Sequence, residues 1–281
     1  MIETSAEYGE AHAPVLQGLW EYVRMGQEDV LRSLYLPACF AFLSHVLLCA
    51  PFFVLDALGS VSQRVRSWRI SAGSGPPPSL RRWSECFWKV LYKYTTVVLP
   101  ATALFNTLLS PKLPADAPTC WQLCMEVVAC LLLFDMLFFI WHYTMHRFSW
   151  LYRSIHQMHH QYHTPFALAA QDSSSAELLS LLLLALSSAW MVGCHPLSEA
   201  LFHLTNTWLA VEDHCGYNLP WALHKLLPCL GGAPHHHTHH RVQTVNYAPF
   251  FTHWDHLFGT YRVLALHPHP NKINIQIKTK M

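Results

Sequence analysis

The sequence predicts an all-α, multi-span membrane protein whose cytosolic side carries a helical cap with a histidine-rich site for two metal ions. Three observations support this prediction: several apolar runs are long enough to cross a bilayer, charged residues are scarce, and histidines gather in three groups. Of the 281 residues, 52% are hydrophobic and only 12% are charged, whereas ordinary soluble domains contain roughly 25% charged residues. The net charge of +1 leaves no excess of lysine and arginine for neutralising phosphates, so nucleic-acid binding is excluded.

Four apolar segments are expected to enter the membrane as helices. A helix needs roughly 17 to 25 residues to cross a bilayer, and residues 38–55 and 121–141 meet that length. Residues 88–109 form a weaker span because Pro100 interrupts their apolar run. Residues 178–211 contain two apolar runs separated by a His-Pro pair, which indicates a helical hairpin that enters the membrane and returns.

The distribution of basic residues predicts which side of the membrane each loop faces. The loop between the first two spans carries six basic residues against one acid, whereas residues 1–35 carry six acids against two arginines. Because basic residues concentrate on the cytosolic side, this loop is predicted to be cytosolic and the N-terminus to lie across the membrane. Counting spans onward places residues 142–175 and 212–281 on the cytosolic side, so the dense histidine groups share one face of the membrane.

Three sequence boxes contain histidines at spacings that suit metal binding. One has the form HxxxH and two have the form HxxHH; their members are His142 and His146, then His156, His159 and His160, then His236, His239 and His240. Helical residues three and four apart share a face, with Cβ atoms roughly 5 to 6 Å apart, and neutral imidazole is the commonest protein metal ligand. Eight imidazoles exceed the four ligands that close a tetrahedral zinc site, and they suit two metals with open positions.

Residues beside the boxes are expected to play supporting roles. His235 and His237 fall on either side of the arc that the third box forms on a helix, and His235 is the better candidate to support the ligands. Replacing His237 is therefore expected to cost far less activity than replacing His236. Asp135 lies within a span, where a carboxylate is costly and so a functional candidate. It precedes His142 by seven residues, about 10 Å along a helix axis, which allows packing or ligand support but not a shared metal.

The order HxxxH, HxxHH, HxxHH among apolar spans resembles the fatty acid hydroxylase and sterol desaturase superfamily of membrane di-iron enzymes. The resemblance covers most of the chain from about residue 130 onward, and it is carried by LLFDMLFFIWH (132–142), WLYRSIHQMHHQ (150–161), PFALAAQ (165–171), GCHPL (193–197), WLAVEDHCGYNLPW (208–221) and NYAPFFTHWDHLFGT (246–260). It implies an N-terminal membrane region at 1–125, a fatty acid hydroxylase-type catalytic region at 126–265 and a tail at 266–281. The fifth and sixth stretches narrow the resemblance to sterol hydroxylases.

This resemblance implies a ninth metal ligand and a set of cofactors. His214, in the stretch EDHCGY, occupies a position where the superfamily keeps a metal-binding histidine, and two iron ions are the expected metals. Asn246, which begins the last stretch, is expected to support the ligands in the same way as His235. The resemblance also implies residence in the endoplasmic reticulum membrane.

The implied reaction is the hydroxylation of an unactivated C–H bond in a membrane sterol, at carbon 25 of cholesterol. Such a bond has no acidic proton and no leaving group, so the chemistry requires O2 activated by a metal rather than acid or base side chains. Two further electrons must come from outside, since the sequence has no GxGxxG dinucleotide fingerprint. The resemblance implies NADPH as their origin and cytochrome b5 or a reductase as the donor.

Two other functions are compatible with the boxes. A sterol desaturase or C4-methyl oxidase of the same superfamily begins with the same hydrogen abstraction. A histidine-rich membrane metal transporter belongs to a different class and predicts ionisable groups along a path through several spans. Histidines dispersed by more than about 15 Å would contradict the two-metal prediction, because two-metal sites hold their ions roughly 3.5 to 4 Å apart.

Overall fold

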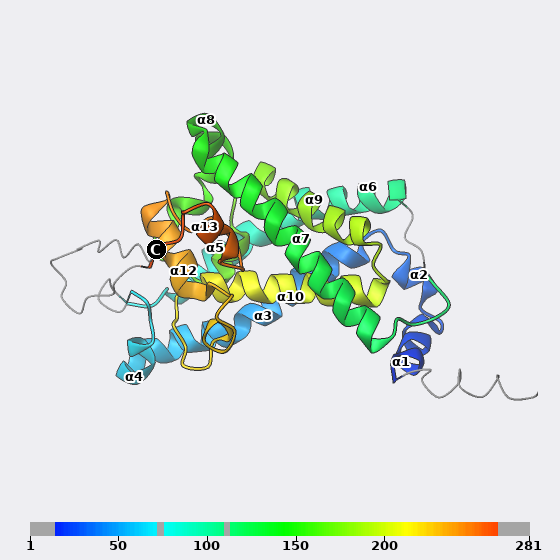
Figure 1. Ribbon diagram of the computed structural model, residues 1–281. Helices are drawn as coiled ribbons and strands as arrows, with labels where there is room; N and C mark the ends of the chain where they lie inside the picture. Colours follow the sequence, from blue (N-terminus) through cyan, green and yellow to red (C-terminus); the bar gives the residue numbers. More distant parts are fainter. Residues whose placement is uncertain (1–14, 72–75, 110–112, 264–281) are drawn as a thin grey trace, which may run out of the picture.

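The chain is helical throughout the part that the structure describes (Figure 1). The computed structural model describes residues 15–71, 76–109 and 113–263, and no strand forms within these ranges. Two isolated β-bridges, Arg69 with Tyr217 and Leu230 with Phe251, are the extended pairings found there. The all-α prediction is therefore confirmed, and the tail predicted at 266–281 lies outside the described residues.

Within the described ranges, three helices are long and apolar enough to cross a membrane: α3 (Leu36–Val61), α7 (Cys120–Arg147) and α9 (Ser175–Val192). They contain the predicted spans at 38–55 and 121–141 and the first arm of the predicted hairpin, whose second arm is α10 (Pro196–His214). The arms are separated at Gly193, which caps α9 with a φ of 72°, a left-handed conformation that glycine adopts without strain.

The region predicted as a span at 88–109 is helical, but it is divided. It comprises α5 (Leu80–Lys93), the π-helix η1 (Tyr94–Val98) and α6 (Leu99–Leu109), so no single long helix forms and the region is not among the three candidate spans. The π-helical turn comes directly before Pro100, which has no N–H to donate to the preceding turn. Widened turns of this kind accommodate a break in the α-helical hydrogen-bond ladder.

Helix α10 is the centre of the assembly. It packs against α3, α7, the 3-10 helix η4 (Ala167–Gln171) and α12 (Gly232–Val242), and α7 also packs against α9. Figure 1 shows α12 and α13 (His253–Leu257) at one end of α10, with α1 (Val15–Arg24) and α2 (Glu28–Leu31) at the other end. The remaining short helices are α4 (Gln63–Ser67), α8 (Ser149–Leu151), the π-helix η2 (Tyr152–His156), the 3-10 helix η3 (His159–Gln161) and α11 (Leu223–Leu226).

Buried carboxylates tie the segments together at the α12 end of the molecule. Asp56 of α3 accepts hydrogen bonds from the Tyr217 hydroxyl at 2.7 Å and from the Trp83 indole at 3.0 Å. The Lys93 ammonium lies 2.6 Å from the carboxylate of Asp172, which is buried. Because partnered charges are the form in which ionic groups persist in an apolar interior, these contacts fix the segments that surround the histidines.

Candidate metal centre

The nine histidines predicted as ligands converge from four separate segments. They come from the end of α7, from η2 and η3, from the end of α10, and from α12; all are buried except His146, which is partly exposed. They form two groups. Each ring offers one nitrogen as a possible ligand atom, and within a group these nitrogens all lie within 4.8 Å of one another. Cluster A consists of His142, His146, His156, His160 and His239, and cluster B consists of His159, His214, His236 and His240.

The two clusters adjoin each other. The ring centroids of His160 in cluster A and His240 in cluster B lie 4.8 Å apart, and those of His156 and His159 lie 5.4 Å apart. The dispersion by more than about 15 Å that would have contradicted a two-metal site is therefore not found. The arrangement brings together all nine predicted residues, including His214, which the resemblance alone indicated.

Each HxxHH box is divided between the two clusters. In the second box, His156 and His160 belong to cluster A whereas His159 belongs to cluster B; in the third box, His236 and His240 belong to cluster B whereas His239 belongs to cluster A. In each box, the first and last histidines, which are four residues apart, belong to the same cluster. The middle histidine, three residues after the first, belongs to the other cluster. On a regular helix the positions i+3 and i+4 are about 100° apart, so one box can serve two neighbouring sites.

The second box does not lie on the regular α-helix expected from its spacing. His156 ends the π-helix η2, and His159 begins the 3-10 helix η3 after a two-residue turn. The third box does lie on an α-helix, α12. This helix begins at Gly232, whose φ is 61° and where an added Cβ would overlap the imidazole of His224, so glycine is required at its start.

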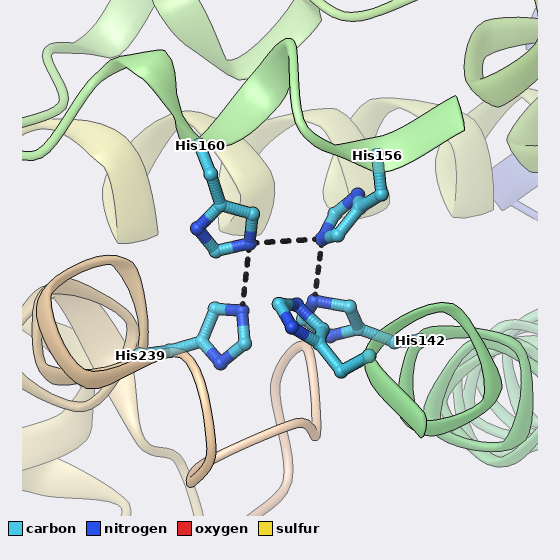
Figure 2. A group of neighbouring side chains, drawn as sticks. His142, His156, His160 and His239 are labelled. Atoms are coloured by element: carbon cyan, nitrogen blue, oxygen red, sulfur yellow. Dashed lines mark hydrogen bonds between the residues drawn. The ribbon is translucent and has the colours of Figure 1, made fainter. Parts of the chain in front are cut away.

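The Nε2 atoms of cluster A face one another around a common centre. Figure 2 shows the rings of His142, His156, His160 and His239 converging, with successive Nε2 atoms 3.0, 2.9 and 3.1 Å apart. In cluster B, the Nε2 atoms of His159, His214, His236 and His240 are linked by separations of 3.1, 3.0 and 3.0 Å. Two nitrogens bound at about 2.1 Å to one metal lie about 3.0 Å apart at right angles and about 3.4 Å apart in a tetrahedron. The observed spacing fits neighbouring ligands at right angles.

The contacts of cluster A cannot all be hydrogen bonds between imidazoles. The Nδ1 groups of His142 and His239 each donate to a backbone carbonyl, of Tyr247 and Val245, at 2.7 Å. A carbonyl only accepts, so the Nε2 atom of each of these neutral rings carries a lone pair. His156 and His160 lie between these two rings, and each would need a proton on Nε2 to donate to such a lone pair. The 2.9 Å contact between His156 and His160 would then bring two N–H groups face to face. A central cation accepts all of these lone pairs, so the donor set fits a metal.

Burial keeps these imidazoles in the form that binds metal. It lowers the pKa of His239 to about 3 and that of His214 to about 4. The pKa values of His159, His236 and His240 are also lowered well below the usual value, first by burial and then by the neighbouring imidazoles. At neutral pH these rings are therefore uncharged, and protons do not compete with a metal for their lone pairs.

A carboxylate that histidine spacing does not indicate lies against one of the predicted ligands. The Nδ1 group of His156 lies 3.0 Å from Oε1 of Glu177, and both side chains are buried. Histidine ligands commonly donate their second N–H to such a carboxylate, which fixes the ring and raises its basicity. The available signal was the pattern Ser174-x-x-Glu177 before an apolar run, a capping box. Ser174 does cap α9, while the Glu177 side chain reaches His156.

The three residues predicted to support the ligands lie around the third box, outside the two clusters. The His235 ring lies 3.2 Å from a carboxylate oxygen of Asp255. The Asn246 amide donates to the carbonyls of His235 and Arg262, at 3.1 and 2.9 Å. Asp135 accepts the backbone N–H groups of Phe250 and Phe251, at 2.9 and 3.1 Å. Each therefore holds backbone or side chains next to α12, and Asp255 joins them as a residue that sequence spacing did not indicate.

A cavity leads from both clusters along the apolar helices. It is bordered by α7, α9 and α10, and its empty volume is about 1020 Å³, with open solvent at its mouth included. Histidines of cluster A (His142, His156) and of cluster B (His159, His214, His236) line the same cavity. Most of its remaining wall is apolar, with Phe134, Phe138, Leu178, Leu181, Leu182 and Ala185. An apolar ligand that enters this cavity would meet both clusters.

Comparison with known proteins identifies the family. The family model described as fatty acid hydroxylase matches residues 127–260. A cholesterol 25-hydroxylase-like protein of Danio rerio is 41% identical over 87% of this chain and 97% of its own length, and the cholesterol 25-hydroxylase of Homo sapiens is 41% identical over 89% and 92%. A methylsterol monooxygenase of Aspergillus fumigatus is 33% identical over 89% of this chain and 85% of its own. No solved structure matches the chain significantly. The chain belongs to the fatty acid hydroxylase family, among the cholesterol 25-hydroxylases and cholesterol 25-hydroxylase-like proteins.

Proposed function

We propose that the protein is a membrane sterol monooxygenase that uses two iron ions, bound by clusters A and B, to convert cholesterol into 25-hydroxycholesterol. The observation that carries this proposal is the apolar cavity that reaches both histidine clusters from among the candidate membrane helices. A substrate dissolved in the membrane can enter such a cavity and place one carbon at the metal centre. The names of the relatives, two cholesterol 25-hydroxylases or like proteins and a methylsterol monooxygenase, support a sterol.

The reaction balances with O2 as the oxidant. One C–H bond is replaced by C–OH, the second oxygen atom leaves as water, and two electrons and two protons are consumed. Bound iron supplies the reduction of O2 that breaking an unactivated C–H bond requires. The protein holds nine imidazoles in place, and Glu177 orients His156 among them. Phe134, Phe138 and the leucines of α9 line the approach, which keeps water from a reactive centre.

The electrons are proposed to come from NADPH through a partner. The sequence contains no GxGxxG fingerprint with which the chain itself could bind a dinucleotide. Cytochrome b5 or a reductase is the proposed donor, the endoplasmic reticulum membrane the proposed location, and the cytosolic side the proposed face for the histidine boxes. The basic loop between the first two predicted spans supports this orientation.

Two alternatives make different predictions. A sterol C4-methyl oxidase or desaturase has the support of the methylsterol monooxygenase among the relatives, and it would give a product altered in the ring system. A metal transporter would place ionisable groups along a path through several spans. The nine histidines instead gather around the ends of α7, α10 and the short helices next to them, which favours catalysis over transport.

The test uses membranes from cells that express the full chain, supplied with cholesterol and NADPH. We expect 25-hydroxycholesterol by mass spectrometry, its loss in His159→Ala and His239→Ala, and its retention in the matched variant His237→Ala, whose residue is buried on α12 but belongs to neither cluster. Absence of any oxygenated sterol from a preparation with verified iron loading would refute the proposal. A desaturated product from cholesterol, or a C4-oxidised product when a 4-methylsterol replaces cholesterol, would support the second candidate.

A further inference from the structure

The cavity has a polar position on α10 at a distance from the histidine clusters. Asn206 lines it eight residues before His214, which is about 12 Å along the helix axis. Phe134 on α7 comes eight residues before His142, and Ala185 on α9 comes eight residues after Glu177, so each lies at a similar distance along its helix. All of these residues line the same cavity. The cavity therefore extends along three helices, and Asn206 belongs to the end remote from the clusters.

The Asn206 side chain has hydrogen-bonding capacity that the described residues do not use. Its Oδ1 atom is buried and has no hydrogen-bond partner among them. Its polar neighbour Thr207 differs, since the Thr207 hydroxyl donates to the carbonyl of His203 at 2.8 Å. A buried acceptor without a partner is destabilising, and such a group in a native structure calls for an explanation. Its position in a ligand-sized cavity makes a ligand donor that explanation.

The chemistry of the proposed substrate matches this position. A sterol carries one hydroxyl at the end of its rigid ring system and an apolar side chain at the opposite end. With the side chain at the metal centre, the rings lie between Phe134, Ala185 and the neighbouring leucines, and the hydroxyl reaches the remote end. The distance from Asn206 to the clusters is about 12 Å along the helix, plus the reach of the side chains. This distance is of the order of the length of a sterol.

We infer that the amide of Asn206 binds the hydroxyl of the sterol and thereby determines which carbon reaches the histidine clusters. This inference rests on the proposed function and adds the residue that recognises the substrate's polar end. Asn206 Oδ1 accepts a hydrogen bond from the sterol hydroxyl, and the phenylalanines and leucines of the wall contact the apolar rings. Hydrogen bonds of this kind in a dry pocket discriminate strongly against analogues that lack the polar group, because the protein atom is then left unpaired.

The test is equilibrium binding of radiolabelled sterols to the purified full chain, which requires no turnover. The wild-type protein is expected to bind cholesterol about tenfold or more tightly than 5-cholestene, which lacks the hydroxyl. Asn206→Leu is expected to bind the two sterols equally, through weaker binding of cholesterol. The matched control Asn106→Leu, on α6 and outside the cavity lining, is expected to keep the wild-type preference.

Equal binding of the two sterols by the wild-type protein would overturn the inference, and so would an undiminished preference in Asn206→Leu. If Asn206→Leu does not yield folded protein, Asn206→Ala removes the same amide with less bulk and is read in the same way. The outcome is separable from the activity test. A wild-type protein without a hydroxyl preference, or a preference that Asn206→Leu leaves unchanged, refutes the role of Asn206 while hydroxylation can stand. Absence of oxygenated product refutes the activity while the binding comparison keeps its meaning.

Discussion

At the scale of the residue, two features distinguish the cluster histidines from the others. One ring nitrogen faces the centre of the cluster, and in several of them a neighbouring group binds the second ring nitrogen. His142, His214 and His239 each donate Nδ1–H to a backbone carbonyl, and His156 is held by the Glu177 carboxylate. These partners leave the Nε2 lone pairs directed at neighbouring Nε2 atoms. His237 lies on the same helix as the third box but belongs to neither cluster. His236 and His237 are neighbours in sequence, but we expect only His236 to be important for metal binding.

The pair His236 and His237 provides a direct comparison. His236→Ala removes one of the four members of cluster B, and we expect hydroxylation to fall by at least about a hundredfold, since even loss of a group that only orients a ligand costs about 10- to 100-fold. His237→Ala is expected to stay within a few-fold of wild type. Product formation per chain at equal expression measures both, and equal losses would contradict the assignment of cluster B.

Glu177 gives a second prediction at this scale. Glu177→Gln keeps the size of the side chain but removes the charge facing His156, so iron affinity is expected to fall about 10- to 100-fold. Titration of metal-free protein with ferrous iron measures the change. Glu85→Gln, at an exposed position, serves as the control and is expected to bind iron as the wild type does. An unchanged affinity in Glu177→Gln would show that the carboxylate does not orient a ligand.

At the scale of the element, the first box depends on how the segment after α12 is anchored. Asp135, in the middle of α7, accepts the N–H groups of Phe250 and Phe251 with its Oδ1 atom. Asp255 of α13 accepts those of Tyr247 and Ala248, at 2.8 and 2.9 Å. Two buried carboxylates thus replace the backbone partners that a strand or helix would supply. They hold the carbonyl of Tyr247 where the His142 ring needs it.

Replacement of Asp135 tests this anchoring. Asp135→Ala leaves two buried N–H groups without partners, each costing about 1 to 3 kcal/mol, and at about 2 to 4 °C per kcal/mol the apparent Tm in detergent should fall by at least about 4 °C. Asp135→Asn retains an Oδ1 acceptor and is expected to recover most of the loss. Thermal unfolding followed by intrinsic fluorescence measures both variants. A Tm for Asp135→Ala equal to that of wild type would contradict the anchoring role.

At the scale of the whole molecule, the helical fold and eight of the nine histidines followed from apolar run length and histidine spacing, which are local properties, whereas His214 followed from the family resemblance alone. The assignment of His159 and His239 to the opposite cluster from their box neighbours followed from neither. It depends on which rings from other segments meet each position, because the third box is divided in the same way on the regular α-helix α12. Glu177 and Asp255 were missed because their partners, His156 and His235, lie 20 or more residues away, where periodicity carries no information.

The predicted orientation can be tested with cysteines that the chain already has. Cys229 and Cys120 are both exposed, but the basic-residue distribution places Cys229 on the cytosolic side and Cys120 on the opposite side. In intact microsomes, a membrane-impermeant maleimide is expected to label a variant that retains only Cys229 and to spare one that retains only Cys120 until detergent is added. Labelling of Cys120 alone in intact vesicles would reverse the orientation.

The central claim is that nine histidines, eight of them buried, hold two metal ions, and metal stoichiometry tests it most directly. Elemental analysis of the full chain, purified without chelators and reconstituted with ferrous iron, should give two irons per chain for the wild type and for His237→Ala. A reduced iron content is expected for His239→Ala, in cluster A, and for His236→Ala, in cluster B. A wild-type protein that binds one iron or none, or keeps two irons after both substitutions are combined, would contradict the account.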